Sequence, residues 1–129
     1  MPLRAFARKL HEAGVPILMG TDAPGTGSVP GFAVHWEINA LLECGLTLPE
    51  VLKISSWNGA RFIDQSLGLP TSVGAIREGW RADLVLLESN PLASAENLKY
   101  PAGVMAAGRW RSGQNLAQRV EAIAVSYGN

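Results

Sequence analysis

The stretch of sequence that decides the fold is Val15-Pro16-Ile17-Leu18-Met19-Gly20-Thr21-Asp22-Ala23-Pro24-Gly25. Its first half is apolar, and the change to glycine, threonine and aspartate is abrupt. An apolar run of this length, ended by chain-breaking residues, is typical of a strand buried on both faces, although a turn of buried helix has the same pattern. Helix-like segments lie before and after the run, and this alternation favours the strand and an α/β fold.

Asp22 directly follows the predicted strand. The carboxyl ends of parallel strands are where α/β barrels and open α/β sheets place their catalytic and ligand-binding side chains. Asp22 is therefore a candidate catalytic or metal-binding residue. An aspartate beside glycine and proline can equally cap the next turn, and the local sequence leaves both interpretations open.

Local end signals predict helices on both sides of this stretch. A first helix ends at Gly14 and a second, starting at Phe32 or Ala33, ends at Gly45, because glycine commonly follows the last helical residue. The first helix carries His11 near its end, which is predicted to be a surface residue rather than a metal ligand.

A capping box and a further cap are predicted next. Thr47 and Glu50 have the spacing of a capping box at the start of a helix from about residue 49 to 56. Asn58 is the predicted N-cap of another short helix.

The composition changes at about residue 67, where glycine becomes frequent and helical signals fade. We therefore predict one module over residues 1–66 and a second over residues 67–129. In the second module, residues 82–87 are a predicted strand and residues 104–111 a predicted hairpin with a tight turn at Gly108-Arg109. Residues 115–127 are a predicted helix.

Four stretches of the sequence, taken in order, belong together: Gly20-Thr21-Asp22-Ala23-Pro24, His35-Trp36-Glu37, Gly45-Leu46-Thr47-Leu48-Pro49-Glu50-Val51-Leu52 and Gly79-Trp80-Arg81-Ala82-Asp83-Leu84-Val85-Leu86-Leu87-Glu88-Ser89-Asn90-Pro91-Leu92. In this order they resemble the closing part of the metal-dependent amidohydrolase superfamily, in its imidazolonepropionase and Xaa-Pro dipeptidase-like branch.

The resemblance implies an α/β fold of a particular kind. Residues 1–66 would be the terminal portion of a (β/α)8 barrel, ending with its last βα unit. Residues 67–129 would be the C-terminal part of a small β-sandwich domain, followed by a final helix. A complete barrel needs about 250 residues, whereas this chain has 129, so we expect a C-terminal fragment of that architecture.

The resemblance also implies an activity and two site residues. The activity is metal-dependent hydrolysis of carbon–nitrogen bonds in small amides, cyclic amides or dipeptides. Asp22 matches the family's aspartate at the end of the last barrel strand, which binds the metal and accepts a proton. His35 matches a position close to the substrate, although a histidine in a first helical turn is often only structural. Asp83 lies in the most family-like stretch and is predicted to be a turn or cap residue rather than a catalytic one.

The chain departs from the family in its ligands. The family has a His-x-His pair and two further histidines, whereas this chain has only His11 and His35. A zinc site uses three or four protein ligands, so we expect the divalent metal, with zinc as the expected ion, only in a complete enzyme. A set made of Asp22, His35 and Cys44 has no recognisable ligand spacing. We expect the isolated chain to be inactive.

Composition excludes several other classes. The net charge is zero, with 47% hydrophobic and 17% charged residues, and gives no electrostatic reason to expect nucleic acid or an anionic membrane as partner. The longest apolar runs fall short of a membrane span. The single cysteine fits a reducing compartment, so we expect a cytoplasmic protein. The loop after Asp22 lacks the lysine of a phosphate-binding loop, and no Gly-x-Ser-x-Gly elbow is present.

Two alternatives to a hydrolase fragment stay open. One is a non-catalytic, truncated or complementing module. A lone parallel strand leaves both edges unpaired, which predicts a partner chain, self-association or a rearranged fold. A small-molecule binding protein that uses the Asp22 loop is the other alternative.

Overall fold

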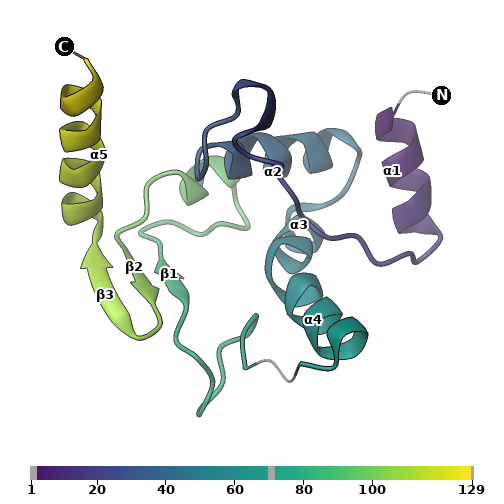
Figure 1. Cartoon of the computed structure of the whole chain (residues 1–129). Helices are drawn as coiled ribbons and strands as arrows, with labels where there is room; N and C mark the ends of the chain where they lie inside the picture. Colours follow the sequence, from purple (N-terminus) through teal and green to yellow (C-terminus); the bar gives the residue numbers. More distant parts are fainter. Residues whose placement is uncertain (1–2, 70–71, 129) are drawn as a thin grey trace. The chain divides into compact units, whose positions relative to one another are not determined.

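The computed structural model describes residues 3–69 and 72–128. Contacts divide the chain into two compact units, Met1–Ala75 and Ile76–Asn129. The division falls inside the glycine-rich stretch where the sequence changes composition. The described part of the first unit is helical, and that of the second combines a small antiparallel sheet with helices, so the fold is of mixed α and β type (Figure 1).

The first unit consists of helices joined by loops. Their bounds are α1 (Leu3–Glu12), the 3-10 turn η1 (Gly25–Gly27), α2 (Ala33–Glu43), α3 (Leu48–Lys53), the π-helical turn η2 (Ile54–Asn58) and α4 (Gly59–Leu67).

The predicted ends of α1 and α2 are confirmed. Gly14 and Gly45 follow these helices with φ of 74° and 91°, values that glycine adopts without steric cost. After α2, the Leu41 carbonyl accepts the Cys44 N–H (3.1 Å) and also the Leu46 N–H (3.4 Å), so the chain beyond the helix folds back onto its last turn. Both leucine side chains are buried, so the helix end also contributes to the core.

The capping box at the start of α3 is confirmed, but the helix that follows differs from the prediction. The Glu50 carboxylate accepts hydrogen bonds from the Thr47 N–H (2.7 Å) and hydroxyl (2.6 Å). Asn58 is not an N-cap, because its φ and ψ of −64° and −39° are helical and α3 continues through η2 into α4. A continuous helix has no orphaned N–H groups at this point for a cap to satisfy.

The apolar core of the described residues lies in the first unit, where α2 packs against α3. Val51 is completely buried, and seven further side chains are at most 9% exposed: Ala33, Ile38, Leu41, Cys44, Leu46, Ile54 and Ala60. These positions come from α2, from the turn after it and from the helix α3–η2–α4. The rigid part of the unit is therefore this group of helices.

The predicted strand at residues 15–22 is wrong as a regular strand. The chain between α1 and η1 forms no ladder with any described residue (Figure 1), and Val15 and Leu18 are 44% and 39% exposed instead of buried on both sides. The physical reason is that a strand needs a hydrogen-bonding neighbour on at least one edge. An extended run with an apolar sequence stays irregular where this neighbour is missing.

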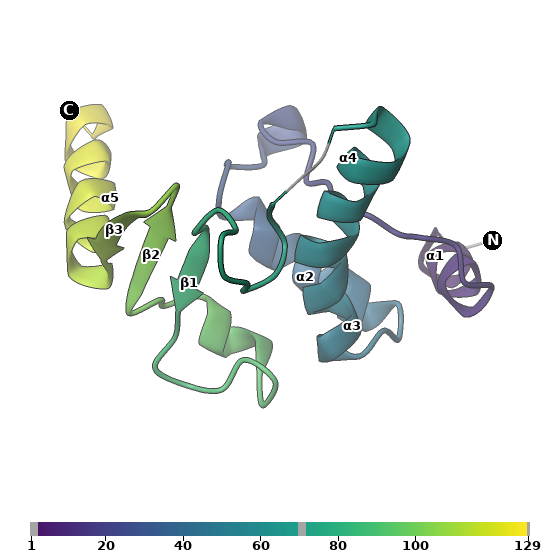
Figure 2. The ribbon, with the colours of Figure 1, turned by 90° about the horizontal axis from the view of Figure 1, so that it is seen from below.

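The second unit contains a three-stranded antiparallel sheet. Its strands are β1 (Leu84–Leu86), β2 (Gly103–Ala106) and β3 (Arg109–Ser112), paired in the order β1-β2-β3, as Figure 2 shows. The predicted hairpin is confirmed, with Met105 opposite Trp110, but its turn lies one residue earlier than predicted, at Ala107 and Gly108, which both have positive φ. Positive φ at both central residues is the geometry that matches the twist of paired strands.

The Asp83 side chain caps this hairpin turn from outside it, which confirms the cap alternative of the prediction that it is a turn or cap residue. Its carboxylate accepts a hydrogen bond from the Ala107 N–H (2.7 Å) and pairs with Arg81 (2.7 Å). The neighbouring Ala82 carbonyl accepts the Gly108 N–H (3.0 Å). The turn is therefore held to the residues just before β1, and Asp83 and Ala107 are 24 residues apart in the sequence.

Two helical segments complete the second unit. They are the 3-10 turn η3 (Ala95–Leu98) and α5 (Gly113–Tyr127). The predicted last helix is confirmed, but it starts two residues earlier than expected, because the Ser112 side chain accepts the Asn115 N–H (3.2 Å) and caps it. Across the described residues, no helix is long and apolar enough to cross a membrane.

Candidate functional site

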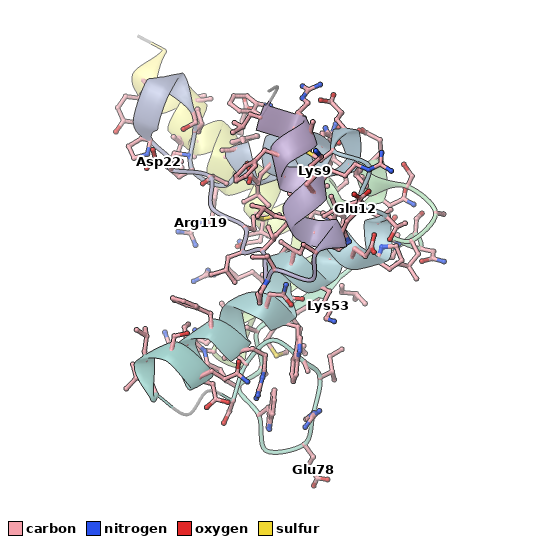
Figure 3. All side chains as sticks on the ribbon, turned by 90° about the vertical axis from the view of Figure 1, so that its right-hand side faces the viewer. Lys9, Glu12, Asp22, Lys53, Glu78 and Arg119 are labelled. Atoms are coloured by element: carbon pink, nitrogen blue, oxygen red, sulfur yellow. The ribbon has the colours of Figure 1, made fainter. Side chains whose placement is uncertain are left out.

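Asp22 stands where the extended stretch turns into the loop that carries η1 (Figure 3). It has a positive φ of 49°, and its carbonyl accepts the Gly25 N–H at 2.8 Å, which closes a tight turn. Its side chain is exposed, and a Cβ on Gly25 would lie 3.5 Å from its Oδ2. A glycine at position 25 therefore leaves open the space beside this carboxylate.

The Asp22 carboxylate has no hydrogen bond or ion pair within the described part of the chain, so it does not cap the following turn by such a bond. A carboxylate presented to solvent on a strained turn is free to take an external partner. Positive φ at a residue other than glycine is sparse and is found at functional sites more often than elsewhere.

His35 lies in the first turn of α2 and is partly buried. Its backbone N–H donates to the Phe32 carbonyl (3.1 Å). No hydrogen bond or ion pair among the described residues joins its imidazole to Asp22. The structure therefore gives both predicted site residues a position in the first unit, but it does not bring them into direct contact.

The described residues do not by themselves fit a metal ion. No group of three or more histidine, cysteine, aspartate or glutamate side chains is placed to hold one within the described ranges. Cys44 is buried at 9% exposure near the end of α2, away from solvent. The combination of Asp22, His35 and Cys44 is therefore not a ligand set, and Asp22 can supply one carboxylate only.

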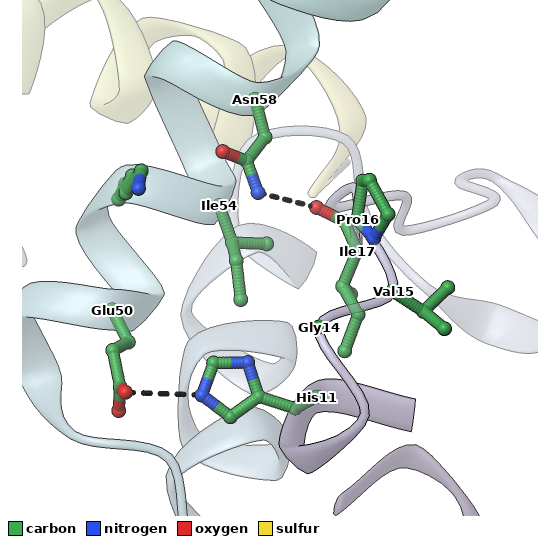
Figure 4. A pocket seen from close by; sticks show the side chains of 9 residues that line it. His11, Gly14, Val15, Pro16, Ile17, Glu50, Ile54 and Asn58 are labelled. Atoms are coloured by element: carbon green, nitrogen blue, oxygen red, sulfur yellow. Dashed lines mark hydrogen bonds and ion pairs between the residues drawn. The ribbon is translucent and has the colours of Figure 1, made fainter. Parts of the chain in front are cut away.

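The first unit also contains a pocket of about 340 Å³ between the end of α1 and the helix α3–η2 (Figure 4). His11 Nε2 lies 3.0 Å from Glu50 Oε1 across its floor, and the Asn58 side-chain amide donates to the Ile17 carbonyl (2.9 Å). Lys53 and Ile54 also line it. Neither Asp22 nor His35 belongs to this lining.

Glu50 is the residue of this pocket whose pKa is shifted. Hydrogen bonds from the Thr47 hydroxyl and N–H, followed by the one from His11, lower the pKa of the Glu50 carboxyl from 4.5 to about 2. Each of these donors stabilises the charged form. The carboxylate therefore both caps α3 and holds the last turn of α1.

Sequence reasoning missed this pocket. His11 and Glu50 are 39 residues apart, and Asn58 and Ile17 are 41 apart, so no spacing rule joins them. The predicted surface position of His11 is consistent with its 32% side-chain exposure, but its partner was not predicted. The local signal that exists, the capping box, explains only the Thr47 side of Glu50.

Comparison with known proteins gives the class of this chain. Residues 3–111 match the model of the amidohydrolase family. The chain belongs to the amidohydrolase family, which confirms the resemblance found in the sequence.

Individual relatives agree with this family. An imidazolonepropionase from Saccharopolyspora erythraea is 32% identical over 117 residues, which make up 88% of this chain and 28% of that protein. An ochratoxinase from Aspergillus niger is 31% identical over 104 residues, or 80% of this chain and 20% of that protein. The crystal structure of a prolidase-like protein from Bifidobacterium longum superposes with a TM-score of 0.70 at 34% identity, covering 92% of this chain and 30% of that one.

The chain thus spans less than a third of the length of these relatives. The segment that the family model matches, residues 3–111, includes Asp22, His35 and all of the hairpin except Ser112.

Proposed function

We propose that this chain is the C-terminal part of a metal-dependent amidohydrolase that hydrolyses carbon–nitrogen bonds in small amides, cyclic amides or dipeptides. The observation that carries the proposal is the continuous family match over residues 3–111. In this proposal the extended stretch before Asp22 is the last strand of a (β/α)8 barrel, and β1, β2 and β3 belong to a small β-sandwich domain. The remaining barrel strands supply the neighbours that residues 15–22 lack.

In the complete enzyme, Asp22 is the proposed metal ligand and proton acceptor, and His35 is the proposed substrate contact. A divalent metal, for which we propose zinc, supplies Lewis-acid activation of the amide and of water. The exposure of the Asp22 carboxylate, its freedom from internal partners and its strained backbone support this role. The chain's own contribution is to hold that one oxygen ligand at the end of an extended segment.

We further propose that the isolated chain is inactive and that it associates with a partner chain or with itself. One carboxylate cannot hold zinc, which takes three or four protein ligands. The unpaired extended stretch supports the association. A complementing, non-catalytic module is the second candidate function, and the same stretch favours it. The single buried Cys44 supports a cytoplasmic location for either one.

The first experiment measures metal content and hydrolysis with the purified chain. Zinc analysis and a panel of dipeptides and cyclic amides are expected to give no bound metal and no metal-dependent turnover. Clear turnover that a chelator abolishes would contradict the claim that this chain is inactive alone.

The second experiment tests Asp22 itself in a hybrid protein. Residues 3–111 of this chain replace the matching segment of the Bifidobacterium longum protein, and hydrolysis is compared among the parent hybrid, Asp22→Asn and Asp64→Asn. Asp64 is a matched control because its carboxylate only pairs with Arg61 on the surface of α4 (3.0 Å). We expect Asp22→Asn to lower turnover at least about a hundredfold, since it removes a group that acts at the reacting atoms.

The outcomes of that comparison separate the two candidates. A hybrid in which Asp22→Asn and Asp64→Asn are equally active refutes the role of Asp22. A hybrid that is inactive before any substitution, yet folded by circular dichroism, favours the non-catalytic module over the hydrolase fragment.

A further inference from the structure

The extended stretch that ends at Asp22 is fixed at both of its ends by local hydrogen bonds. At the start, the Val15 N–H donates to the Leu10 carbonyl (3.0 Å), and at the end, the Gly25 N–H donates to the Asp22 carbonyl (2.8 Å). Between these two points, one side-chain hydrogen bond from a distant element reaches the described backbone of the stretch. It runs from Asn58 Nδ2 to the Ile17 carbonyl at 2.9 Å, across 41 residues of sequence (Figure 4).

Asn58 belongs to the helix α3–η2–α4, which contributes buried side chains to the core of the first unit. It ends the π-helical turn η2, between Ile54, which is 4% exposed, and Ala60, which is 5% exposed. The hydroxyls of Ser55 and Ser56 both donate to the Leu52 carbonyl (3.0 and 2.6 Å). These side-chain bonds give this carbonyl partners at the point where the α-helix changes into the π-helical turn. Such π-helical turns occur often at functional sites, because they re-aim the side chains that follow.

Partly buried and exposed side chains alternate along the extended stretch, and the hydrogen bond from Asn58 can hold this arrangement. Ile17, Met19 and Thr21 are partly buried, whereas Leu18, Gly20 and Asp22 are exposed. In an extended chain, neighbouring side chains point to opposite sides, so a rotation or slip by one residue exchanges the two sets. Among the residues that the structure describes, no strand ladder holds the stretch against such a slip.

We propose that Asn58 is a positioning residue for Asp22. Its amide fixes the rotation of the extended stretch at Ile17, so that Ile17, Met19 and Thr21 face the helices and the Asp22 carboxylate faces outward. The functional part of this inference rests on the proposed role of Asp22. Its structural part depends only on the bond between Asn58 and Ile17.

The chemistry of the bond explains why an amide is required. A carbonyl oxygen accepts, so its partner must carry N–H or O–H. Asn58→Asp keeps the shape of the side chain but faces the Ile17 carbonyl with a carboxylate oxygen, which cannot donate when ionised. Asn58→Ala removes the partner without adding a charge, and Asn58→Gln retains the amide on a longer stem.

The test is nuclear magnetic resonance of the whole chain at pH 7. The carbonyl carbon-13 shift of Ile17 reports the hydrogen bond, and the nitrogen-15 order parameters of residues 18–22 report how well the stretch is fixed. In the parent we expect order parameters near about 0.85, as in rigid backbone. In Asn58→Asp and Asn58→Ala we expect a shifted Ile17 carbonyl and values below about 0.6.

Matched variants keep the result interpretable. Asn39→Asp makes the same chemical change at an exposed position of α2 and is expected to leave both signals as in the parent. Asn58→Gln is expected to restore the Ile17 shift at least in part. If Asn58→Asp and Asn58→Ala fail to fold, then a folded Asn58→Gln with the parental shift supports the proposal, and an unfolded one overturns it.

The proposal is also overturned if Asn58→Asp leaves the Ile17 shift and the order parameters indistinguishable from those of Asn39→Asp. This result is independent of the hybrid experiment. If the Asp22→Asn hybrid stays active, the catalytic assignment of Asp22 fails, whereas the measurement on this chain still decides whether Asn58 holds the stretch.

Discussion

Three hydrogen-bond donors converge on the Glu50 carboxylate, two from Thr47 and one from His11. They lower its pKa in the folded chain to about 2, whereas the ordinary value is 4.5. The folded state therefore binds this proton less readily than the unfolded state. The stabilisation by Glu50 is fully present above about pH 4.5 and is lost as the pH falls from there towards 2.

We predict that Glu50→Gln removes part of this acid dependence. The melting temperature of the parent is expected to fall between pH 4.5 and pH 2, and that of Glu50→Gln is expected to change less over the same window. Thermal unfolding followed by circular dichroism at several pH values measures both. Glu121→Gln, a change of the same kind on α5, is the control and should follow the parent. If the melting temperatures of the parent and of Glu50→Gln change in parallel with pH, the lowered pKa of Glu50 does not contribute to the pH dependence of stability.

Single residues show where sequence reasoning succeeds. Thr47 and Glu50 were predictable as a capping box because both partners lie within four residues of each other. The contact between His11 and Glu50 was not, because it depends on how α1 meets α3. Asp22 and His35 were chosen through family resemblance, and the geometry gives each a place without testing its role.

The helix α5 packs little against the rest of its unit, so its first turn contributes strongly to its stability. None of its residues is buried, and its contacts with other elements are to β2 and β3. A 15-residue helix in water is marginal without packing. The hydrogen bond from the Asn115 N–H to the Ser112 hydroxyl therefore contributes a large share of what holds the helix in place.

We predict that Ser112→Ala frays the start of α5. Loss of a serine N-cap costs about 1 kcal/mol, which is enough to lower the helical population of an element with so little packing. Carbon-13 secondary shifts of residues 113–117 measure this population. Ser126→Ala is the matched control, because its hydroxyl donates to the Ile123 carbonyl (2.8 Å) near the other end of the same helix. An equal effect of both variants, or no effect of either, would contradict the importance of the cap.

Whether a helix end, turn or strand could be predicted depends on how far apart in the sequence the residues that determine it lie. Helix ends at Gly14 and Gly45 and the hairpin turn at Gly108 were predictable because glycine at positive φ is a local requirement. The π-helical turn at Ile54–Asn58 has no such local requirement, so an N-cap was predicted at Asn58 instead. The strand at residues 15–22 was predicted from a local pattern, yet its formation depends on neighbours from elsewhere.

The described part of the chain exposes more large apolar side chains than its core buries. The core lies in α2, the turn after it and the helix α3–η2–α4, whereas Val15, Leu18 and Val29 of the same unit are at least 39% exposed. The relatives are more than three times as long as the part of them that this chain matches. A segment taken from a larger fold would have this distribution, because surfaces that face its missing neighbours are apolar.

This distribution leads to a prediction about association. The stretch 15–22 combines exposed apolar side chains with backbone groups that lie outside any ladder, and such an edge pairs readily with another chain. We predict that the weight-average mass of the chain in sedimentation equilibrium rises with concentration. Leu18→Lys is expected to reduce this rise, because a charge on an open edge opposes pairing.

Val29→Lys is the matched control, because it places the same charge on an exposed apolar residue (51%) of the following loop, outside the extended stretch. If the stretch is the site of association, Val29→Lys keeps the concentration dependence of the parent. A parent that stays monomeric at millimolar concentration would argue against association through this stretch. An equal reduction by both variants would instead indicate a general effect of charge, since then the position of the lysine would not matter.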